Sequence, residues 1–243
     1  MSTDGNKRIA CVAILLICVS CAARRDPLPE FPRVVLWAWE RPERLTYLDP
    51  NKVAVAYLAA TIGWRDGELK VRPRYQPLDV PPGAVVMAVV RLESGPGPLP
   101  DADLTAERVV ASVPASRAKA LQIDFDTRLS EREWYARVLR DVRRRLPANV
   151  SLNITALASW CLGDPWIRNL PINDAVPMLF RRGAGEPQEI RDFSSEVCRS
   201  SVGISTDETA IAPPHGRRIF IFHPRPWTPE AYRAAMELAR RMR

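Results

Sequence analysis

Eight short apolar runs recur along this chain, and they restrict its possible folds more than any other feature. The runs are rich in Val, Ile, Leu, Ala and Phe, and turn signals or helical patterns follow several of them. They cover residues 34–39, 53–61, 84–92, 121–126, 150–157, 174–180, 202–205 and 218–222. Near-continuous apolar strands are typical of a parallel sheet that is covered on both faces.

Eight such strands predict an α/β fold of the (β/α)8 TIM-barrel type, in a single domain over residues 34–243. Helical patterns cover residues 104–118, residues 130–146, with Ser130 and Glu133 as a capping box, and the stretch from Thr228 onward; residues 68–75 read as a side strand. The barrel would be lean or irregular, because little sequence is left for some of its helices. An open α/β sheet is the alternative.

No nucleotide-binding loop follows any of the apolar runs. The patterns G-x-G-x-x-G and G-x-x-x-x-G-K-[ST] are both missing after the strands, which argues against dinucleotide and P-loop folds. We therefore expect no cofactor. The formal charge is +7, but the Arg residues are spread over many segments and no nucleic-acid-binding motif is present, so nucleic acid is not an expected partner.

The first twenty residues read as an export signal. Lys7 and Arg8 precede an apolar run over residues 9–19, and small residues follow that run. A positive start, a short apolar core and a small-residue cleavage region describe a secretory signal peptide. The run is too short for a comfortable transmembrane span.

Cys21 is a candidate lipidation site. The stretch Cys-Val-Ser-Cys that ends at Cys21 resembles a bacterial lipoprotein box, although that pattern usually has Leu at its first position. Plain cleavage after Ala23 is the competing interpretation. Residues 21–33 would then be a lipidated cysteine and a Pro-rich tether. Ala22 carries no retention signal, so we expect an exported protein of the cell envelope, anchored by lipid to the periplasmic face of the outer membrane.

Two cysteines remain in the mature chain. In an oxidising compartment, Cys161 and Cys198 invite a disulfide bond. The alternative is two unrelated small buried side chains. No His or further Cys lies at ligand spacing from them, so we expect no metal site.

Two acidic residues mark the end of the fourth run. In residues 120–128, Asp124 and Asp126 alternate with apolar residues, so both carboxylates lie on one face of the strand. Such a pair is a candidate floor for a catalytic or ligand site; the simpler interpretation is a strand that meets solvent. Two close carboxylates repel, so one pKa should be raised if no cation is near.

Other polar and aromatic residues stand at the ends of other runs, where a barrel carries its chemistry. They are Trp39 and Glu40, Glu93, Trp160, Arg181, Glu208 and His223. Acids and aromatic rings on one rim suit carbohydrate, because carboxylates bind hydroxyls and aromatic faces stack on sugar rings. Several also have a structural interpretation: Glu40 as a partner of Arg41 or Arg44, one of Trp37 and Trp39 as a core residue with Trp39 preferred for the rim, and His223 as a hydrogen-bonded structural histidine.

Five phrases carry a resemblance to a known family. They lie at residues 37–43, 122–126, 155–161, 176–181 and 203–208, and in this order they resemble the bacterial family of unknown function numbered 3142. The resemblance runs from about residue 34 to the end of the chain and supplies no established activity. Such proteins look like glycoside-hydrolase barrels, which is an analogy of fold only.

A more distant comparison bears on mechanism. Family-18 chitinases carry D-x-x-D-x-D-x-E at the end of the fourth strand, and the Glu is their acid. Aligned on Asp124 and Asp126, this chain has Leu121 at the first position and Arg128 at the Glu position. The chitinase mechanism therefore does not transfer.

These residues lead to one function hypothesis with two alternatives. The hypothesis is an exported, glycoside-hydrolase-like barrel that acts on envelope or extracellular glycans, with Asp124, Asp126 and Glu40 as catalytic candidates. Trp39, Trp160, Arg181, Glu208 and His223 would bind the substrate. One alternative is a glycan-binding lipoprotein without turnover. The other is a phosphoester enzyme in which Asp-x-Asp holds Mg²⁺.

Overall fold

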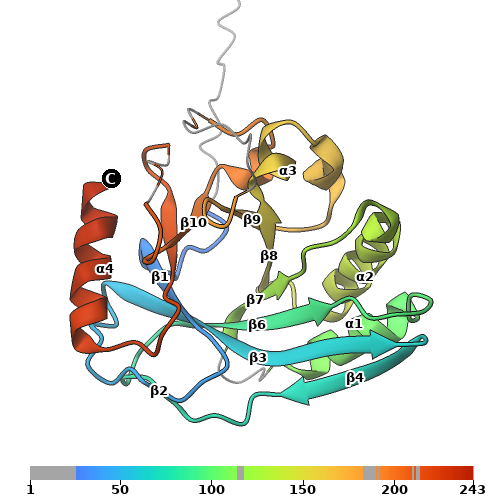
Figure 1. Ribbon diagram of the computed structural model, residues 1–243, viewed down its shortest axis with the longest axis horizontal. Helices are drawn as coiled ribbons and strands as arrows, with labels where there is room; N and C mark the ends of the chain where they lie inside the picture. Colours follow the sequence, from blue (N-terminus) through green and yellow to red (C-terminus); the bar gives the residue numbers. More distant parts are fainter. Residues whose placement is uncertain are drawn as a thin grey trace, which may run out of the picture.

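Eight parallel strands close into a barrel (Figure 1). The computed structural model describes residues 26–113, 118–182, 190, 192–209, 211 and 214–242. The strand order is β1-β11-β10-β9-β8-β7-β6-β3, and β3 pairs back onto β1. In chain order the barrel strands are β1 (Val34–Ala38), β3 (Val53–Arg65), β6 (Val86–Glu93), β7 (Ala118–Asp124), β8 (Ser151–Leu157), β9 (Asp174–Met178), β10 (Ser201–Ser205) and β11 (Arg218–Phe222). The barrel prediction is confirmed, and the open-sheet alternative is wrong.

Within the residues that the structure describes, helices cover only part of the barrel, as the short connections require. The α-helices are α1 (Ala102–Ala111), α2 (Arg132–Arg145), α3 (Ala158–Leu162) and α4 (Pro229–Arg241). The 3₁₀ turns are η1 (Leu129–Glu131), η2 (Pro165–Asn169) and η3 (Glu196–Cys198). Between β1 and β6 the chain instead forms β2 (Glu43–Arg44), β5 (Leu78–Asp79) and β4 (Glu68–Pro73), and β4 runs antiparallel to β3.

Two helix boundaries differ from the sequence prediction. The helix expected over residues 104–118 ends at Ala111, and Ala118 already belongs to β7. The capping interaction expected from Ser130 and Glu133 is made two residues earlier, where the Glu131 carboxylate accepts the backbone N–H of Arg128. The reason is that the chain enters α2 through the 3₁₀ turn η1.

Side chains alternate between the inside of the barrel and its outer layer. Trp37 points inward from β1 and donates its indole N–H to Gln122 on β7 over 2.8 Å. Its ring also lies against Gly203 on β10, where a Cβ atom would come within 2.8 Å of it. The outer layer packs under the helices, and the apolar stripe of α2, including Tyr135 and Leu139, is fully buried there.

The chain seals the end of the barrel where the strands begin. Leu28 and Phe31 are buried in the cluster that fills the barrel interior. Arg218, the first residue of β11, donates to the Asp26 carboxylate and to the carbonyls of Leu28 and Phe31. Residues 26–33 therefore belong to the folded domain, which starts earlier than the expected residue 34.

A disulfide bond joins Cys161 in α3 to Cys198 in η3, as predicted. It connects the segments that follow β8 and β9, with Cα atoms 5.9 Å apart. No helix within the described residues is long and apolar enough to span a membrane. Cys21 and the expected signal segment lie outside the described residues.

Candidate functional site

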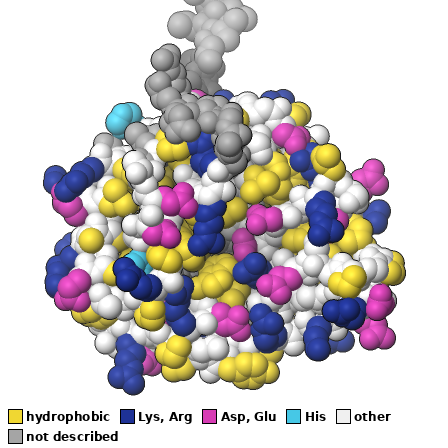
Figure 2. Space-filling view, viewed as in Figure 1, with side chains coloured by type: hydrophobic (Ala, Val, Ile, Leu, Met, Phe, Trp, Pro, Cys, Tyr) yellow, Lys and Arg dark blue, Asp and Glu magenta, His cyan; other side chains and the backbone are white. Residues whose placement is uncertain are grey.

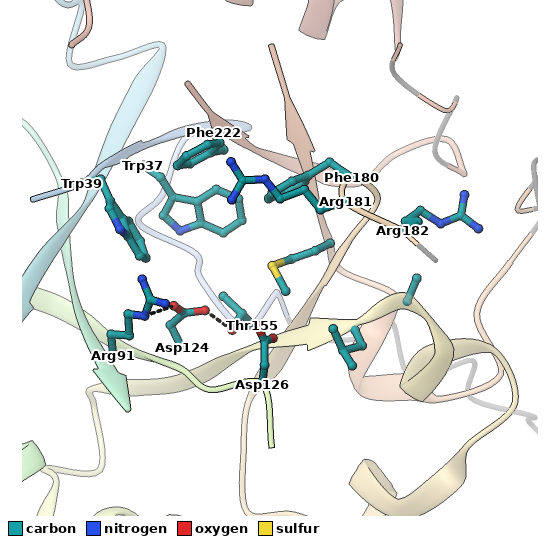
Figure 3. Close-up of a pocket in the computed structure, with 13 residues that line it drawn as sticks. Trp37, Trp39, Arg91, Asp124, Asp126, Thr155, Phe180, Arg181, Arg182 and Phe222 are labelled. Atoms are coloured by element: carbon teal, nitrogen blue, oxygen red, sulfur yellow. Dashed lines mark hydrogen bonds and ion pairs between the residues drawn. The ribbon is translucent and has the colours of Figure 1, made fainter. Parts of the chain in front are cut away.

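A pocket of about 200 Å³ lies at the ends of the barrel strands where (β/α)8 proteins carry their chemistry. It is built from residues at or just after the ends of β1, β6, β7, β8, β9 and β11 (Figure 3). Its lining consists of Trp37, Trp39, Arg91, Asp124, Asp126, Thr155, Leu157, Ala158, Met178, Phe180, Arg181, Arg182 and Phe222. In the space-filling view, hydrophobic side chains line a hollow and charged side chains surround it (Figure 2).

Asp124, the last residue of β7, lies on the pocket floor. Its carboxylate accepts a hydrogen bond of 2.7 Å from the Thr155 hydroxyl, and Arg91 Nε lies 3.9 Å away. Burial raises the pKa of Asp124 above its ordinary value, and the negative charges of Asp126 and Glu93 act in the same direction. Thr155 and Arg91 oppose this rise without cancelling it. Asp124 therefore binds its proton more strongly than an ordinary aspartate.

Asp126 supplies a second carboxylate two residues further on. It is exposed and lines the same pocket as Asp124 (Figure 3). The two carboxylates thus differ in environment, since one is largely buried and the other meets solvent. Such an asymmetric pair is what acid–base chemistry uses, because different surroundings separate the roles of two chemically identical groups.

Four aromatic rings form the opposite wall of the pocket. Phe180 and Phe222 stack with an interplanar angle of 3° and ring centroids 5.8 Å apart. Trp39 meets Phe222 edge-on at 6.3 Å, and Trp37 meets Phe180 at the same distance. Trp37 is buried beneath, whereas Trp39, Phe180 and Phe222 are half-buried and can offer ring surface to a ligand.

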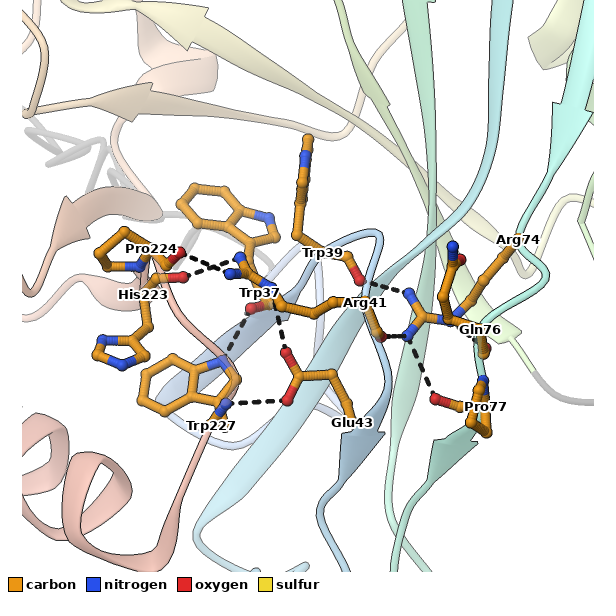
Figure 4. Close-up of polar contacts among 10 residues, drawn as sticks. All are labelled: Trp37, Trp39, Arg41, Glu43, Arg74, Gln76, Pro77, His223, Pro224 and Trp227. Atoms are coloured by element: carbon orange, nitrogen blue, oxygen red, sulfur yellow. Dashed lines mark hydrogen bonds and ion pairs between the residues drawn. The ribbon is translucent and has the colours of Figure 1, made fainter.

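A buried polar network holds the tryptophans of this wall in place (Figure 4). Glu43 accepts the backbone N–H of Trp227 at 2.9 Å, and Arg41 Nε lies 3.5 Å from the other carboxylate oxygen. Trp227 in turn donates its indole N–H to the carbonyl of Trp37. The guanidinium of Arg74 donates to the carbonyl of Trp39. The loop after β1 is thereby tied to the loop after β11.

The structure brings four of the predicted site residues together in this pocket: Trp39, Asp124, Asp126 and Arg181. Trp160 lies elsewhere. It is 2% exposed in the outer core and packs against Trp166 with ring centroids 5.0 Å apart, so the expectation that it forms a sugar platform is wrong. The cause is the turn into α3 directly after β8, which points the indole away from the rim.

Three further predicted residues lie outside the pocket lining. Glu40 forms an ion pair with Arg72 of β4, with Oε1 and Nε 3.3 Å apart. Glu208 accepts the backbone N–H of Arg181. His223 makes a 2.6 Å hydrogen bond with the Thr206 hydroxyl, and burial lowers the pKa of its ring.

Sequence reasoning missed Arg91, Thr155, Phe180 and Phe222, and did not settle the position of Trp37. All five share one signal, which is their place on the inward face near the end of a predicted strand. Arg91, for example, is the next-to-last residue of the predicted run 84–92, and Phe180 is the last residue of the predicted run 174–180. Strand alternation, followed consistently, would have selected them.

Within the described residues, no three His, Cys, Asp or Glu side chains are grouped so that they could hold a metal ion. The hypothesis that Asp-x-Asp binds Mg²⁺ stays untested, and no contact in the pocket adds support to it.

Comparison with known proteins identified no matching family model and no matching curated protein. The resemblance to the family numbered 3142 therefore stays a prediction. Among solved structures, the chain is similar to the spore cortex-lytic enzyme SleL of Bacillus cereus, with a TM-score of 0.45 and 18% sequence identity. The match covers 76% of this chain and 55% of that one, so the chain spans about half the length of that structure.

Proposed function

We propose that the rim pocket binds a sugar ring of a glycan. The observation that carries this proposal is the arrangement of the pocket, in which the aromatic wall faces the two carboxylates across about 200 Å³. Aromatic faces match the apolar face of a sugar ring, and carboxylates accept hydrogen bonds from its hydroxyls. A pocket of this volume suits a single ring, with the rest of the glycan extending outward over the rim.

We further propose that the two carboxylates cleave the glycosidic bond. Asp124, which holds its proton more strongly, would protonate the leaving oxygen as the bond to the anomeric carbon breaks. Asp126, which is exposed, would act in one of two ways. It would attack the anomeric carbon to form a glycosyl ester, which water then hydrolyses with Asp124 taking the proton of that water, or it would take a proton from a water that attacks the anomeric carbon directly. A raised pKa on one carboxyl supports this division of roles.

The test is the release of reducing ends from a panel of bacterial envelope and extracellular polysaccharides. The protein starts at Asp26, the first residue that the structure describes. The variants are Asp124→Asn and Asp126→Asn, and the matched control is Asp79→Asn, since Asp79 is exposed on β5 outside the pocket. Release by the wild type and the control that is lost in both variants supports hydrolysis. Release that persists in Asp124→Asn contradicts the assignment of the acid.

Binding without turnover is the second candidate, and one observation favours it. Arg128, which stands where family-18 chitinases have their acid, is exposed outside the pocket lining, and Glu40 is paired with Arg72. Asp124 and Asp126 are the acids of the lining as the structure describes it. If glycans bind but no panel member is cleaved, and Asp124→Asn weakens binding, the binding role replaces hydrolysis.

We also propose that residues 1–20 direct export and that Cys21 carries a lipid. The fold is compatible with an anchor at this end of the chain, because residues 26–33 cover the end of the barrel opposite the pocket. A lipid at Cys21 would therefore leave the pocket facing away from the membrane. Loss of the protein from the membrane fraction in Cys21→Ser, with the wild type retained there, is the expected result. Equal retention of both forms contradicts lipidation at this cysteine.

A further inference from the structure

Arg181 has an unusual backbone conformation at the edge of the pocket. Its φ angle is 51°, in the left-handed region that residues other than glycine rarely adopt. The Glu208 carboxylate accepts the backbone N–H of Arg181 with both oxygens, at 2.9 and 3.2 Å. Strained conformations of this kind persist where surrounding contacts fix them, and they cluster at ligand sites. Here the contact from Glu208 fixes the backbone and leaves the side chain directed to the pocket (Figure 3).

The guanidinium of Arg181 stacks on the aromatic wall. Its Cζ atom lies 5.2 Å from the ring centroid of Phe222, which is itself stacked on Phe180. A guanidinium that stacks by its face keeps its N–H donors at the edge, in the plane of the group. Because Arg181 lines the pocket, its N–H donors are within reach of a ligand there (Figure 3).

No carboxylate of the described chain forms an ion pair with the Arg181 guanidinium. The hydrogen bond from the Ser205 hydroxyl and, to a smaller extent, the charge of Arg181 lower the pKa of Asp207. The Asp207 carboxylate thus has its hydrogen bond from Ser205 and not from Arg181. Arg91, by contrast, is matched by Glu93 at 3.3 Å and by Asp124 at 3.9 Å. Arg181 thus brings to the pocket a positive charge that no direct ion pair in the described chain balances.

We propose that the glycan bound in this pocket carries an anionic group, a carboxylate or a sulfate, and that Arg181 binds that group through its guanidinium. This inference rests on the proposed glycan-binding function and gives it a substrate class. The rigid fork of N–H donors matches the paired oxygens of a uronic acid or a sulfate ester. The sugar ring then packs on Trp39 while its anionic substituent reaches Arg181.

The experiment compares ligands that differ only in charge. Oligosaccharides of glucose, galactose and mannose are each used in a neutral, a uronate and a sulfated form, and binding to the full chain is measured by calorimetry. The wild type should bind at least one anionic form about tenfold or more tightly than its neutral counterpart, with the advantage reduced by added salt. The uronate and sulfate arms distinguish the two sources of the anion.

Three variants assign the preference. Arg181→Gln removes the charge and keeps a non-glycine residue at this backbone position, and it should lose the preference. Arg181→Lys keeps the charge without the fork and should retain only part of it. The matched control is Arg233→Gln, which removes the same charge from an exposed site on α4 and should bind as the wild type does. Circular dichroism and thermal unfolding confirm that each variant is folded.

The possible outcomes distinguish a failure of the anionic specificity from a failure of the proposed glycan-binding function. Equal binding of neutral and anionic forms overturns the anionic specificity and leaves glycan binding intact. A preference that survives in Arg181→Gln overturns the role of Arg181. A wild type that binds no form of any of the three backbones counts against the glycan-binding function itself, and the inference falls with it.

Discussion

The hydroxyl of Thr155 donates a 2.7 Å hydrogen bond to the carboxylate of Asp124 across the neighbouring strands β8 and β7. This bond favours the charged form of Asp124, whereas burial favours the neutral form. Burial is the larger effect, so the pKa is raised. Thr155 therefore limits how far the pKa of Asp124 rises. The pairing of β7 with β8 brings the Thr155 hydroxyl within hydrogen-bond distance of the Asp124 carboxylate.

Replacing Thr155 by valine should raise the pKa of Asp124 further, because the contact that stabilises its charge is lost. The measurement is an NMR titration of the aspartate carboxyl carbons, with the Asp124 signal assigned from its loss in Asp124→Asn. Thr61→Val is the control, since Thr61 is buried on β3 outside the pocket lining. An Asp124 titration midpoint that is unchanged or lower in Thr155→Val would contradict the assigned role.

Asp124→Asn should stabilise the fold at high pH. Because the folded state raises the pKa of Asp124, it binds this proton more tightly than the unfolded chain does. The free energy of unfolding therefore falls as the pH rises from the ordinary carboxyl range through the raised pKa, and the cost is absent below that range. Asparagine removes the cost, and we expect a gain of about 0.5–2 kcal/mol, as for other stabilising single substitutions.

Urea denaturation at pH 4 and pH 8 checks this sign. The gain of Asp124→Asn over the wild type should be larger at pH 8 than at pH 4. A larger gain at pH 4, or a loss of stability at pH 8, would show that burial is not the dominant influence on this carboxyl. Asp79→Asn again serves as the exposed control.

Glu43→Ala should destabilise the rim of the barrel. The Glu43 side chain is 1% exposed, and its removal leaves the backbone N–H of Trp227 and the charge of Arg41 without their acceptor. Breaking a buried charged contact of this kind costs about 3 kcal/mol of unfolding free energy. Glu43→Gln keeps an oxygen for Trp227 and should lose less. Equal losses in the two variants would contradict the importance of this hydrogen bond.

Removal of the disulfide should lower the free energy of unfolding by about 2–4 kcal/mol, since the bond closes a loop between residues 37 positions apart. Urea denaturation of the double variant Cys161→Ala, Cys198→Ala measures the loss. Dithiothreitol should produce a similar loss in the wild type and no further loss in the double variant. A wild type that is indifferent to the reductant, although free-thiol assay shows reduction, would contradict a stabilising role.

The sequence was sufficient for the barrel because each of the eight strands is an apolar run with its own turn signals. It also indicated Asp124 and Asp126, which both line the pocket, although β7 ends at Asp124 and Asp126 lies just beyond the strand. It failed for Trp160, since a helix that starts directly after a strand turns the next side chains in directions that strand periodicity does not describe. The contact between Glu208 and the backbone of Arg181 joins two loops, and no local pattern encodes it.

Trp39 and Trp160 give a direct comparison of a pocket tryptophan with a core tryptophan. Trp39 is half-buried in the pocket wall, where Arg91 lies 6.0 Å from its ring, so Trp39→Ala should weaken binding of the tightest-binding glycan about tenfold. Trp160→Phe should leave that binding unchanged and lower the free energy of unfolding by about 1–3 kcal/mol, because the indole packs in the outer core. Calorimetry and urea denaturation of both variants separate the two effects. If Trp160→Phe weakens binding as much as Trp39→Ala without a loss of stability, the ligand contacts Trp160, which lies outside the pocket lining, and the pocket is not where the glycan binds.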